Sequence, residues 1–178
     1  MNTDKTKIQI EQKIDDIIKI LGLKKTDSIK DTPKRVAKMI IDELFIGLQK
    51  EKFPEYKMFK VKRISEPVVV ENISINSICE HHFLPFIGTA TFKYLPNDKV
   101  IGLSKIPRII DFLARKPNIQ ENLTIEIYDV FSKILKTDSI FVELSCEHLC
   151  AKIRGVKDCC IMKTCKFGGI FKNKLNNI

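Results

Sequence analysis

The stretch VVVENISINSICEHHFLPFIGTATFKYLPND, residues 68–98, determines the class of fold that the chain can adopt. The β-branched run at its start and the alternation of Ile73 and Ile75 predict a strand. Residues 87–94 predict a second strand, which the turn-forming sequence Leu95-Pro96-Asn97-Asp98 ends. The chain therefore changes here from helical periodicity to strand periodicity.

The sequence on both sides of this stretch alternates between helical and extended patterns. Apolar residues at spacings of three and four predict helices before it and directly after it, and extended patterns return towards the end. We expect helices at about 14–21, 32–47, 104–117 and 120–135, and further strands at about 140–144 and 153–171. This order indicates an α+β fold with a largely antiparallel sheet. We expect an N-terminal helical region, residues 1–62, and a second domain, residues 63–178.

The composition narrows the class of protein. The 178 residues are 44% hydrophobic and 30% charged, with few Gly and Pro, so a collagen-like or disordered chain is excluded. No apolar run reaches the roughly 20 residues that a membrane-spanning helix needs, and no export signal is visible. We expect a cytoplasmic protein in which the six cysteines are reduced thiols or metal ligands rather than disulfides.

The three histidines of the chain all lie beside cysteines. The first cluster is Cys79-Glu80-His81-His82, and the second is His148-Leu149-Cys150. Thiolate and imidazole are zinc ligands, and a catalytic zinc keeps three protein ligands and an open position. Cys79, His82 and Cys150 would form such a set, which leaves His81 and His148 free to carry protons. Cys146 could be a fourth ligand and close the site.

Basic side chains around these clusters suggest an anionic substrate. The net charge is +9, from 31 basic and 22 acidic residues, and most of the lysines fit a solvated surface. Ser104, Lys105 and Arg108 lie at a predicted helix N-terminus, where anions are favoured. The other candidate cations are Arg154, just beyond Cys150, and Arg35 and Lys38, one helical turn apart. The pair Gln120-Glu121 begins a helix, so its carboxylate could be a helix-end charge or could accept the N–H groups of a guanine edge.

Four motifs in this order and spacing resemble the GTP cyclohydrolase I family. They are C-E-H-H-x-x-P-F-x-G from Cys79, G-L-S-K-I-x-R from Gly102, Q-E-x-L-T from Gln120 and H-x-C-x-x-x-R-G-V from His148. The resemblance runs from Thr32 to Phe171, which is about three quarters of the chain.

The resemblance implies a role for each candidate residue. Zinc (Zn2+) is bound by Cys79, His82 and Cys150, and His81 and His148 are the acid–base pair. Glu121 holds the guanine with backbone groups near Leu103 and Gln120. Ser104 lies near the ribose, and the triphosphate is held by Lys105, Arg108 and Arg154 and, from a neighbouring subunit, by Arg35 and Lys38.

The resemblance also implies the fold, the assembly and the reaction. We expect a helical arm followed by a tunnelling-fold domain with an antiparallel sheet and two helices, assembled as a toroidal homodecamer with active sites at subunit interfaces. The substrate is GTP: water attacks C8, the imidazole ring opens and formate leaves. The ribose then rearranges to give 7,8-dihydroneopterin triphosphate, the first step of folate and other pteridine synthesis. No nucleic-acid or membrane partner is expected.

The chain departs from the family pattern at Lys116, Asn118 and Asn122, and in the cysteines after Val156. At the first three positions we expect weaker helix-end or interface contacts rather than lost chemistry. The cysteines should preserve the fold but make the chain sensitive to oxidation. One alternative is a paralogous tunnelling-fold enzyme that acts on another purine or pterin. The other is a structural-zinc module that binds nucleic acid, for which the absence of Trp and the scarcity of Tyr are unfavourable.

Overall fold

The N-terminal part of the chain is helical. The computed structural model describes residues 3–62 and 64–174, and the chain divides into two compact units, residues 1–52 and 53–178. In the first unit, α1 (Thr3–Ile20) packs against α2 (Thr32–Met39). A π-helical turn, Ile40–Leu44, and two 3₁₀ turns, Ile46–Leu48 and Lys50–Lys52, follow. The helix expected to reach residue 47 therefore loses its α-helical hydrogen bonding after Met39.

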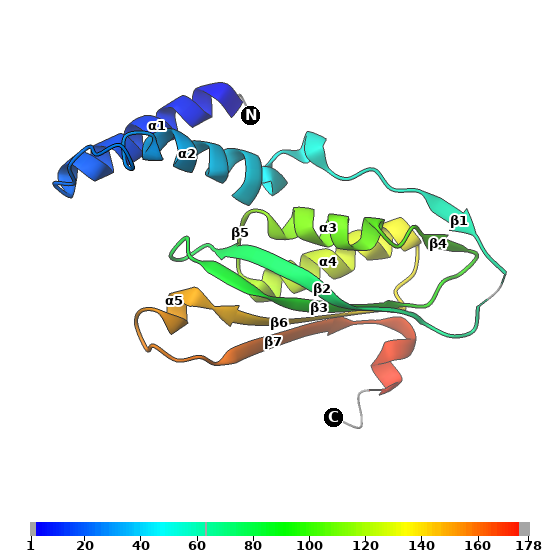
Figure 1. Ribbon diagram of the computed structural model, residues 1–178. Coiled ribbons are helices and arrows are strands. Elements are labelled where there is room, and N and C mark those ends of the chain that lie inside the picture. The colour runs from blue at the N-terminus through cyan, green and yellow to red at the C-terminus, as the bar shows by residue number, and fades with distance from the viewer. Residues whose placement is uncertain (1–2, 63, 175–178) are drawn as a thin grey trace. The chain divides into compact units, whose positions relative to one another are not determined.

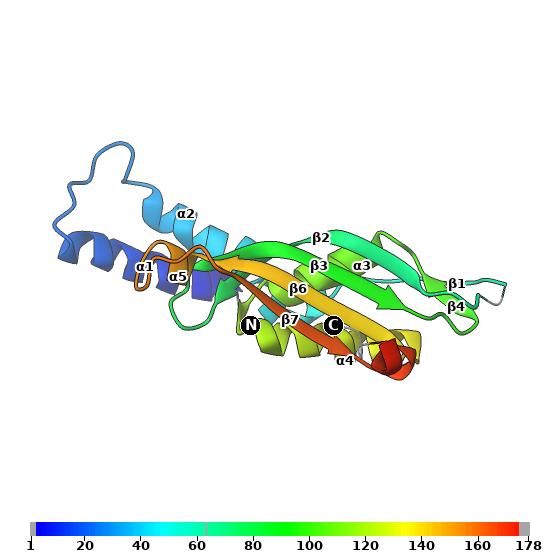
Figure 2. The same ribbon diagram turned by 90° about the horizontal axis from the view of Figure 1, so that it is seen from below.

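The second unit is built on a five-stranded sheet (Figures 1 and 2). Its strand order is β5-β2-β3-β6-β7, and only the β5–β2 pair is parallel. The separate pair β1–β4 is antiparallel. The strands are β1 (Met58–Lys60), β2 (Val68–Cys79), β3 (Pro85–Tyr94), β4 (Lys99–Ile101), β5 (Pro117–Asn118), β6 (Ile140–His148) and β7 (Ile161–Phe167).

A β-bulge divides β2. Val70 pairs with Phe92 and Ile73 pairs with Ala90, so β2 has one more residue than β3 between these pairs. Asn72 takes up the extra residue with a φ of 57°, in the left-handed region that Asn tolerates better than most residues. Before the bulge the even-numbered residues are the more buried ones, and after it the odd-numbered residues are.

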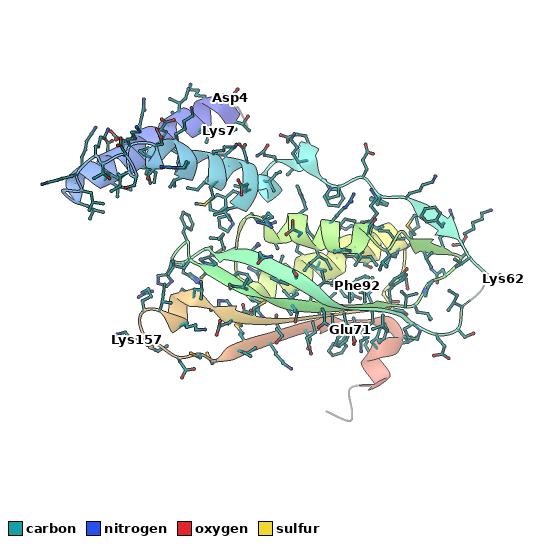
Figure 3. All side chains as sticks on the ribbon, viewed as in Figure 1. Asp4, Lys7, Lys62, Glu71, Phe92 and Lys157 are labelled. Atoms are coloured by element: carbon teal, nitrogen blue, oxygen red, sulfur yellow. The ribbon has the colours of Figure 1, made fainter. Side chains whose placement is uncertain are left out.

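Helices α3 (Lys105–Ala114) and α4 (Gln120–Leu135) cover one face of this sheet (Figure 1). Burying their apolar stripes against the sheet removes apolar surface from water, which is the main force that stabilises the unit. Phe92, labelled in Figure 3, is fully buried, and its ring lies 4.4 Å from that of Phe131 on α4. The remaining helical segments of the unit are the short helix α5 (Leu149–Lys152) and a 3₁₀ segment, Gly169–Lys174.

The expected α+β architecture is confirmed: helices come first, followed by a mainly antiparallel sheet with two helices on one face. The limits of α4 agree with the expected 120–135. In contrast, the strand expected at 153–171 is shorter, because α5 and a loop come before β7. Among the described residues, no helix is both long enough and apolar enough to cross a membrane.

Candidate metal centre

Four strands bring the motif residues to one end of the sheet. β2 ends at Cys79, and the parallel bridge to β5 pairs Cys79 with Asn118, directly before the start of α4. β6 ends at His148, which pairs with Phe86 on β3. The chain then turns into α5, which carries Cys150. Residues far apart in the sequence thus meet where these strands end.

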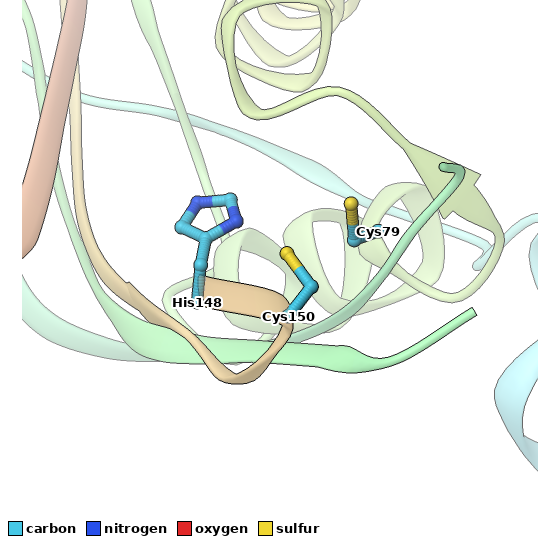
Figure 4. A group of neighbouring side chains, drawn as sticks. All are labelled: Cys79, His148 and Cys150. Atoms are coloured by element: carbon cyan, nitrogen blue, oxygen red, sulfur yellow. The ribbon is translucent and has the colours of Figure 1, made fainter. Parts of the chain in front are cut away.

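Cys79, His148 and Cys150 form a compact group of possible metal ligands. Their ligand atoms, two sulfurs and one ring nitrogen, all lie within 4.8 Å of one another. In Figure 4 the three side chains converge on a common point, with the His148 ring turned towards the two sulfur atoms. Two thiols and an imidazole at this spacing are the donor set that zinc prefers. The group is partly shielded, since Cys79 is buried and the other two residues are half-buried.

The charge state of Cys150 depends on its neighbours. Burial raises the pKa of the Cys150 thiol, and the adjacent Cys79 sulfur raises it further, while the Arg154 guanidinium opposes both effects. Without a metal, Cys150 is therefore held as a thiol at neutral pH. A divalent cation would reverse this balance, because a coordinated thiol loses its proton.

His148 is held on two sides. Its ring stacks on Phe86, with the centroids 4.7 Å apart and the planes at 11°. Its Nε2 lies 2.8 Å from the Gln120 side-chain oxygen. Burial lowers the pKa of His148, and the nearby Glu121 carboxylate works in the opposite direction. Burial therefore favours the neutral ring, which can accept a proton.

The other two histidines lie on the turn between β2 and β3. Hydrogen bonds from Cys79 N to Leu84 O and from Phe83 N to Cys79 O close this turn, both at 2.9 Å. His81 and His82 are exposed on it, with ring centroids 6.3 Å apart. The Nδ1 of His81 lies 3.7 Å from the Cys79 sulfur. Within the described part of the chain, the ligand group contains His148 and does not contain His82.

Cys146 lies outside the ligand group. It is 1% exposed in the hydrophobic core, and burial raises the pKa of its thiol to about 12. The structure thus places Cys146 among apolar neighbours rather than at the metal group.

The candidate cations lie in three separate places. Arg154 follows α5, and its charge acts on Cys150. Ser104 is the N-cap residue of α3, and Lys105 and Arg108 lie in the first turns of that helix. Arg35 and Lys38 are exposed on α2 in the other unit, where an Arg35 Nη donates to Ser28 O at 2.9 Å.

The N-terminal end of α3 lies away from the ligand group. At about 1.5 Å per residue, this helix of 10 residues separates its ends by about 15 Å. Its C-terminal end is the one near β2, since Ser77 Oγ donates to Ala114 O at 2.7 Å, and Figure 1 shows the helix running from β4 towards β5. A single chain therefore brings Gln120, Glu121 and Arg154 near the ligand group, but not Ser104, Lys105 or Arg108.

Three contacts of the site were not expected from the sequence. They are the stacking of Phe86 on His148, the bond from Gln120 to His148, and the buried Asn118, whose amide nitrogen lies within 3.3 Å of four acceptors. The two buried carboxamides could have been suspected, because Asn and Gln next to apolar runs need hydrogen-bond partners when they are buried. Their partners are distant in sequence and follow only from the topology.

Comparison with known proteins identifies the family of the chain. A sequence model of the GTP cyclohydrolase I family matches residues 10–177. The chain is 40% identical to a GTP cyclohydrolase 1 of Yersinia pseudotuberculosis over 99% of this chain and 81% of that protein. It is 42% identical to a GTP cyclohydrolase 1 of Vibrio cholerae over 94% of this chain and 78% of that protein. A third GTP cyclohydrolase 1, from Tolumonas auensis, is 41% identical over 97% and 82% of the two chains.

Fold and site together first define a class: an α+β enzyme of the tunnelling-fold type, with a thiol–imidazole group at the end of its sheet. Within that class, the chain belongs to the GTP cyclohydrolase I family, whose members are hydrolases.

Proposed function

We propose that the chain is a zinc-dependent enzyme that converts GTP to 7,8-dihydroneopterin triphosphate and releases C8 as formate. The observation that carries this proposal is the group formed by Cys79, His148 and Cys150, directly beside the Gln120-Glu121 pair that begins α4. Metal ligands, a neutral imidazole and a carboxylate for the guanine edge then lie at one place. The names of the relatives support the choice of GTP as substrate.

Zinc is the metal that suits this donor set, and we assign it to Cys79, Cys150 and His82. The two thiols already lie close together, and His82 is exposed on the turn that begins at Cys79. When bound, zinc would lower the pKa of a bound water towards ~7 and polarise the substrate. The assignment leaves His148 free to exchange protons.

The remaining residues bind the substrate and move protons. His148 can accept a proton on the side of the thiols, and His81 lies on the exposed turn with its Nδ1 3.7 Å from the Cys79 sulfur. The Glu121 carboxylate can accept the paired N–H donors of guanine. In the roles that the resemblance implies, Ser104 lies near the ribose, and the triphosphate is bound by the cations Lys105, Arg108, Arg154, Arg35 and Lys38.

A complete site needs more than one chain. Because α3 keeps Ser104, Lys105 and Arg108 about a helix length from the ligand group, these residues would reach the substrate from another subunit. This agrees with the toroidal homodecamer that the resemblance implies. The cytoplasm remains the proposed location, since metal-binding thiols need a reducing compartment and the six cysteines are all free.

The test is purified protein incubated with GTP, with formate and the fluorescence of the oxidised pterin followed together. Both products should appear, stop on chelation and return when zinc is added back. GDP and 2′-deoxy-GTP, tested in parallel, measure the preference for the triphosphate and the 2′-hydroxyl. Folded, zinc-loaded protein that releases no formate from GTP would overturn the proposal and favour another purine as substrate.

A pair of variants tests the ligand assignment. His82→Ala should lose bound zinc and activity together, whereas His148→Ala should keep zinc and lose only formate release. Metal content by mass spectrometry and folding by circular dichroism separate the two effects. The opposite pattern, with zinc lost from His148→Ala alone, would make His148 the third ligand and His82 the proton carrier.

A further inference from the structure

The Gln120 side chain is enclosed by hydrogen-bond partners. Only 1% of the residue is exposed, although it begins a helix, where side chains commonly reach solvent. Its amide nitrogen lies 3.0 Å from Met162 O, 3.3 Å from Leu144 O and 3.1 Å from Thr164 Oγ1. These acceptors belong to β6 and β7, so the helix start is tied to the sheet.

These partners fix which way the carboxamide points. An amide nitrogen carries two hydrogens, while the oxygen can only accept. If the group were flipped, its oxygen would face two backbone carbonyl oxygens with no hydrogen between them, at the cost of buried unsatisfied groups. The amide oxygen must therefore face His148, at 2.8 Å from Nε2.

The orientation of Gln120 decides where His148 carries its hydrogen. Because the Gln120 oxygen can only accept, Nε2 must donate, and in a neutral imidazole Nδ1 then holds the free lone pair. The stacked Phe86 ring restricts the plane of the imidazole. Figure 4 shows the edge of the ring directed at the sulfur atoms of Cys79 and Cys150.

We propose that Gln120 is a positioning residue, whose carboxamide holds His148 in the tautomer with a hydrogen on Nε2 and a free Nδ1 lone pair directed at the thiol pair. The catalytic meaning of this inference rests on the proposed function, in which His148 carries protons. The resemblance gives Gln120 only a backbone contact with guanine, so the role of its side chain is additional. Gln120 touches neither the reacting atoms nor the metal; it acts through His148.

Nitrogen-15 solid-state NMR of the imidazoles tests the tautomer directly. The chain has three histidines, so His148 can be assigned by its loss in His148→Ala, and the spectrum requires neither substrate nor metal. The wild-type protein at neutral pH should show His148 protonated on Nε2 and bare on Nδ1. A His148 signal from a ring protonated on Nδ1 would overturn the proposal.

Variants then link the tautomer to turnover. In Gln120→Met the tautomer should become mixed and kcat should fall roughly tenfold to a hundredfold, as for other residues that orient catalytic ligands, with little change in KM. Gln120→Glu keeps an acceptor for Nε2, and the backbone carbonyls that the amide nitrogen now faces favour the protonated carboxyl, whose O–H can donate to them. This variant should retain the tautomer and recover part of kcat. The matched control is Thr164→Val, which removes an acceptor of Gln120 but no contact to His148, and should leave both readouts near wild type.

The outcomes separate the two proposals. If the wild-type tautomer is as expected but GTP is not converted, the proposed function fails and the positioning role stands. A folded Gln120→Met with unchanged tautomer and unchanged kcat would overturn the positioning role alone. If Gln120→Met does not fold, the positioning role of Gln120 is still tested by the wild-type spectrum and by the comparison of Thr164→Val with Gln120→Glu.

Discussion

The cysteines of this chain differ sharply in their surroundings. Cys146 is enclosed in the core, whereas Cys159, Cys160 and Cys165 are exposed. Thiolate is the reactive form of cysteine, so exposure and charge state together decide which sulfur reacts. Exposed thiols make handling under reducing conditions advisable.

Alkylation should follow this division. With iodoacetamide at pH 8, Cys159, Cys160 and Cys165 should be labelled first, because the pKa of about 12 at Cys146 leaves almost no thiolate there. Mass spectrometry of peptides over time gives the order. Raising the pH towards 12 should increase the fraction of thiolate at Cys146, but labelling there should rise only as far as the fold lets the reagent reach the sulfur. Early labelling of Cys146 at pH 8 would contradict its burial.

Asn118 and Asn122 both depart from the family pattern, yet their surroundings are opposite. The Asn118 amide nitrogen lies 3.0 Å from Ser77 Oγ and 3.0 Å from Lys116 O, and the residue is 6% exposed beside Cys79. Asn122 is exposed on α4. Weaker contacts were expected at both positions, but Asn118 lies at the centre of a hydrogen-bond network.

Replacing each by alanine should separate the two positions. Asn118→Ala leaves buried acceptors without a donor and should cost about 1–3 kcal/mol, with weaker zinc binding because the strand end at Cys79 loosens. Asn122→Ala should change stability by no more than about 0.5 kcal/mol. Denaturant unfolding and zinc titration measure both effects, and equal losses in the two variants would refute the distinction.

At the scale of elements, Gly88 of β3 lies against the backbone of β6 with no room for a side chain. Gly88 pairs with Cys146, and a Cβ at this position would collide with Ser145 O and lie 2.7 Å from the Cys146 Cα. Both neighbours are backbone atoms, which cannot turn aside as a side chain can. The motif that includes Gly88 therefore has a packing reason as well as a chemical one.

Gly88→Ala should destabilise the second unit by about 1–3 kcal/mol or more, as overpacking does in well-packed regions. Gly102→Ala is the matched control, since its Cβ would make only ordinary van der Waals contacts, with the Phe59 ring at 3.4 Å and with Lys105 Cγ at 3.8 Å. Thermal unfolding of the two variants compares them. A Gly88→Ala protein as stable as wild type would mean that the strands can separate at this point without cost.

How far the sequence predicts the elements depends on their length and pattern. α4 has an unbroken apolar period and begins just after Pro117, so its limits could be predicted. β1, β4 and β5 have three residues or fewer, which is too short for a periodic signal. The site shows the same difference. The ligand residues lie in short motifs and could be predicted from the sequence, whereas the contact of Gln120 with His148 joins residues 28 positions apart and depends on the sheet.

At the scale of the whole molecule, the proposed function makes the ligand group and the α3 cations two parts of one site. α3 holds these cations about 15 Å from the strand end where the ligands meet. Under this proposal, a substrate that contacts both parts lies between chains, and assembly is a requirement for activity.

Mixing two inactive variants tests this requirement. His148→Ala and Arg108→Ala should each be inactive or nearly so, and co-assembled from equal amounts they should regain activity. If each site combines two chains, random assortment in a symmetric ring restores about a quarter of the sites. Light scattering should show ten times the protomer mass of 20.5 kDa. Assembled mixtures without activity would indicate that each chain completes its own site.

The bulge at Asn72 has a consequence for the chemistry of a residue that it never touches. Side chains of a strand alternate between two faces, so one additional residue exchanges the faces of everything that follows. If β2 kept all its residues but paired with β3 without a bulge, the alternation set by Val68 and Val70 would continue, and Cys79 would point to the side opposite Cys150. The extra residue therefore determines the face on which the later side chains lie. Deleting Asn72 itself would leave Cys79 on its present face, whereas a β2 of full length without the bulge would carry an intact metal motif whose two sulfurs lie on different sides of the sheet.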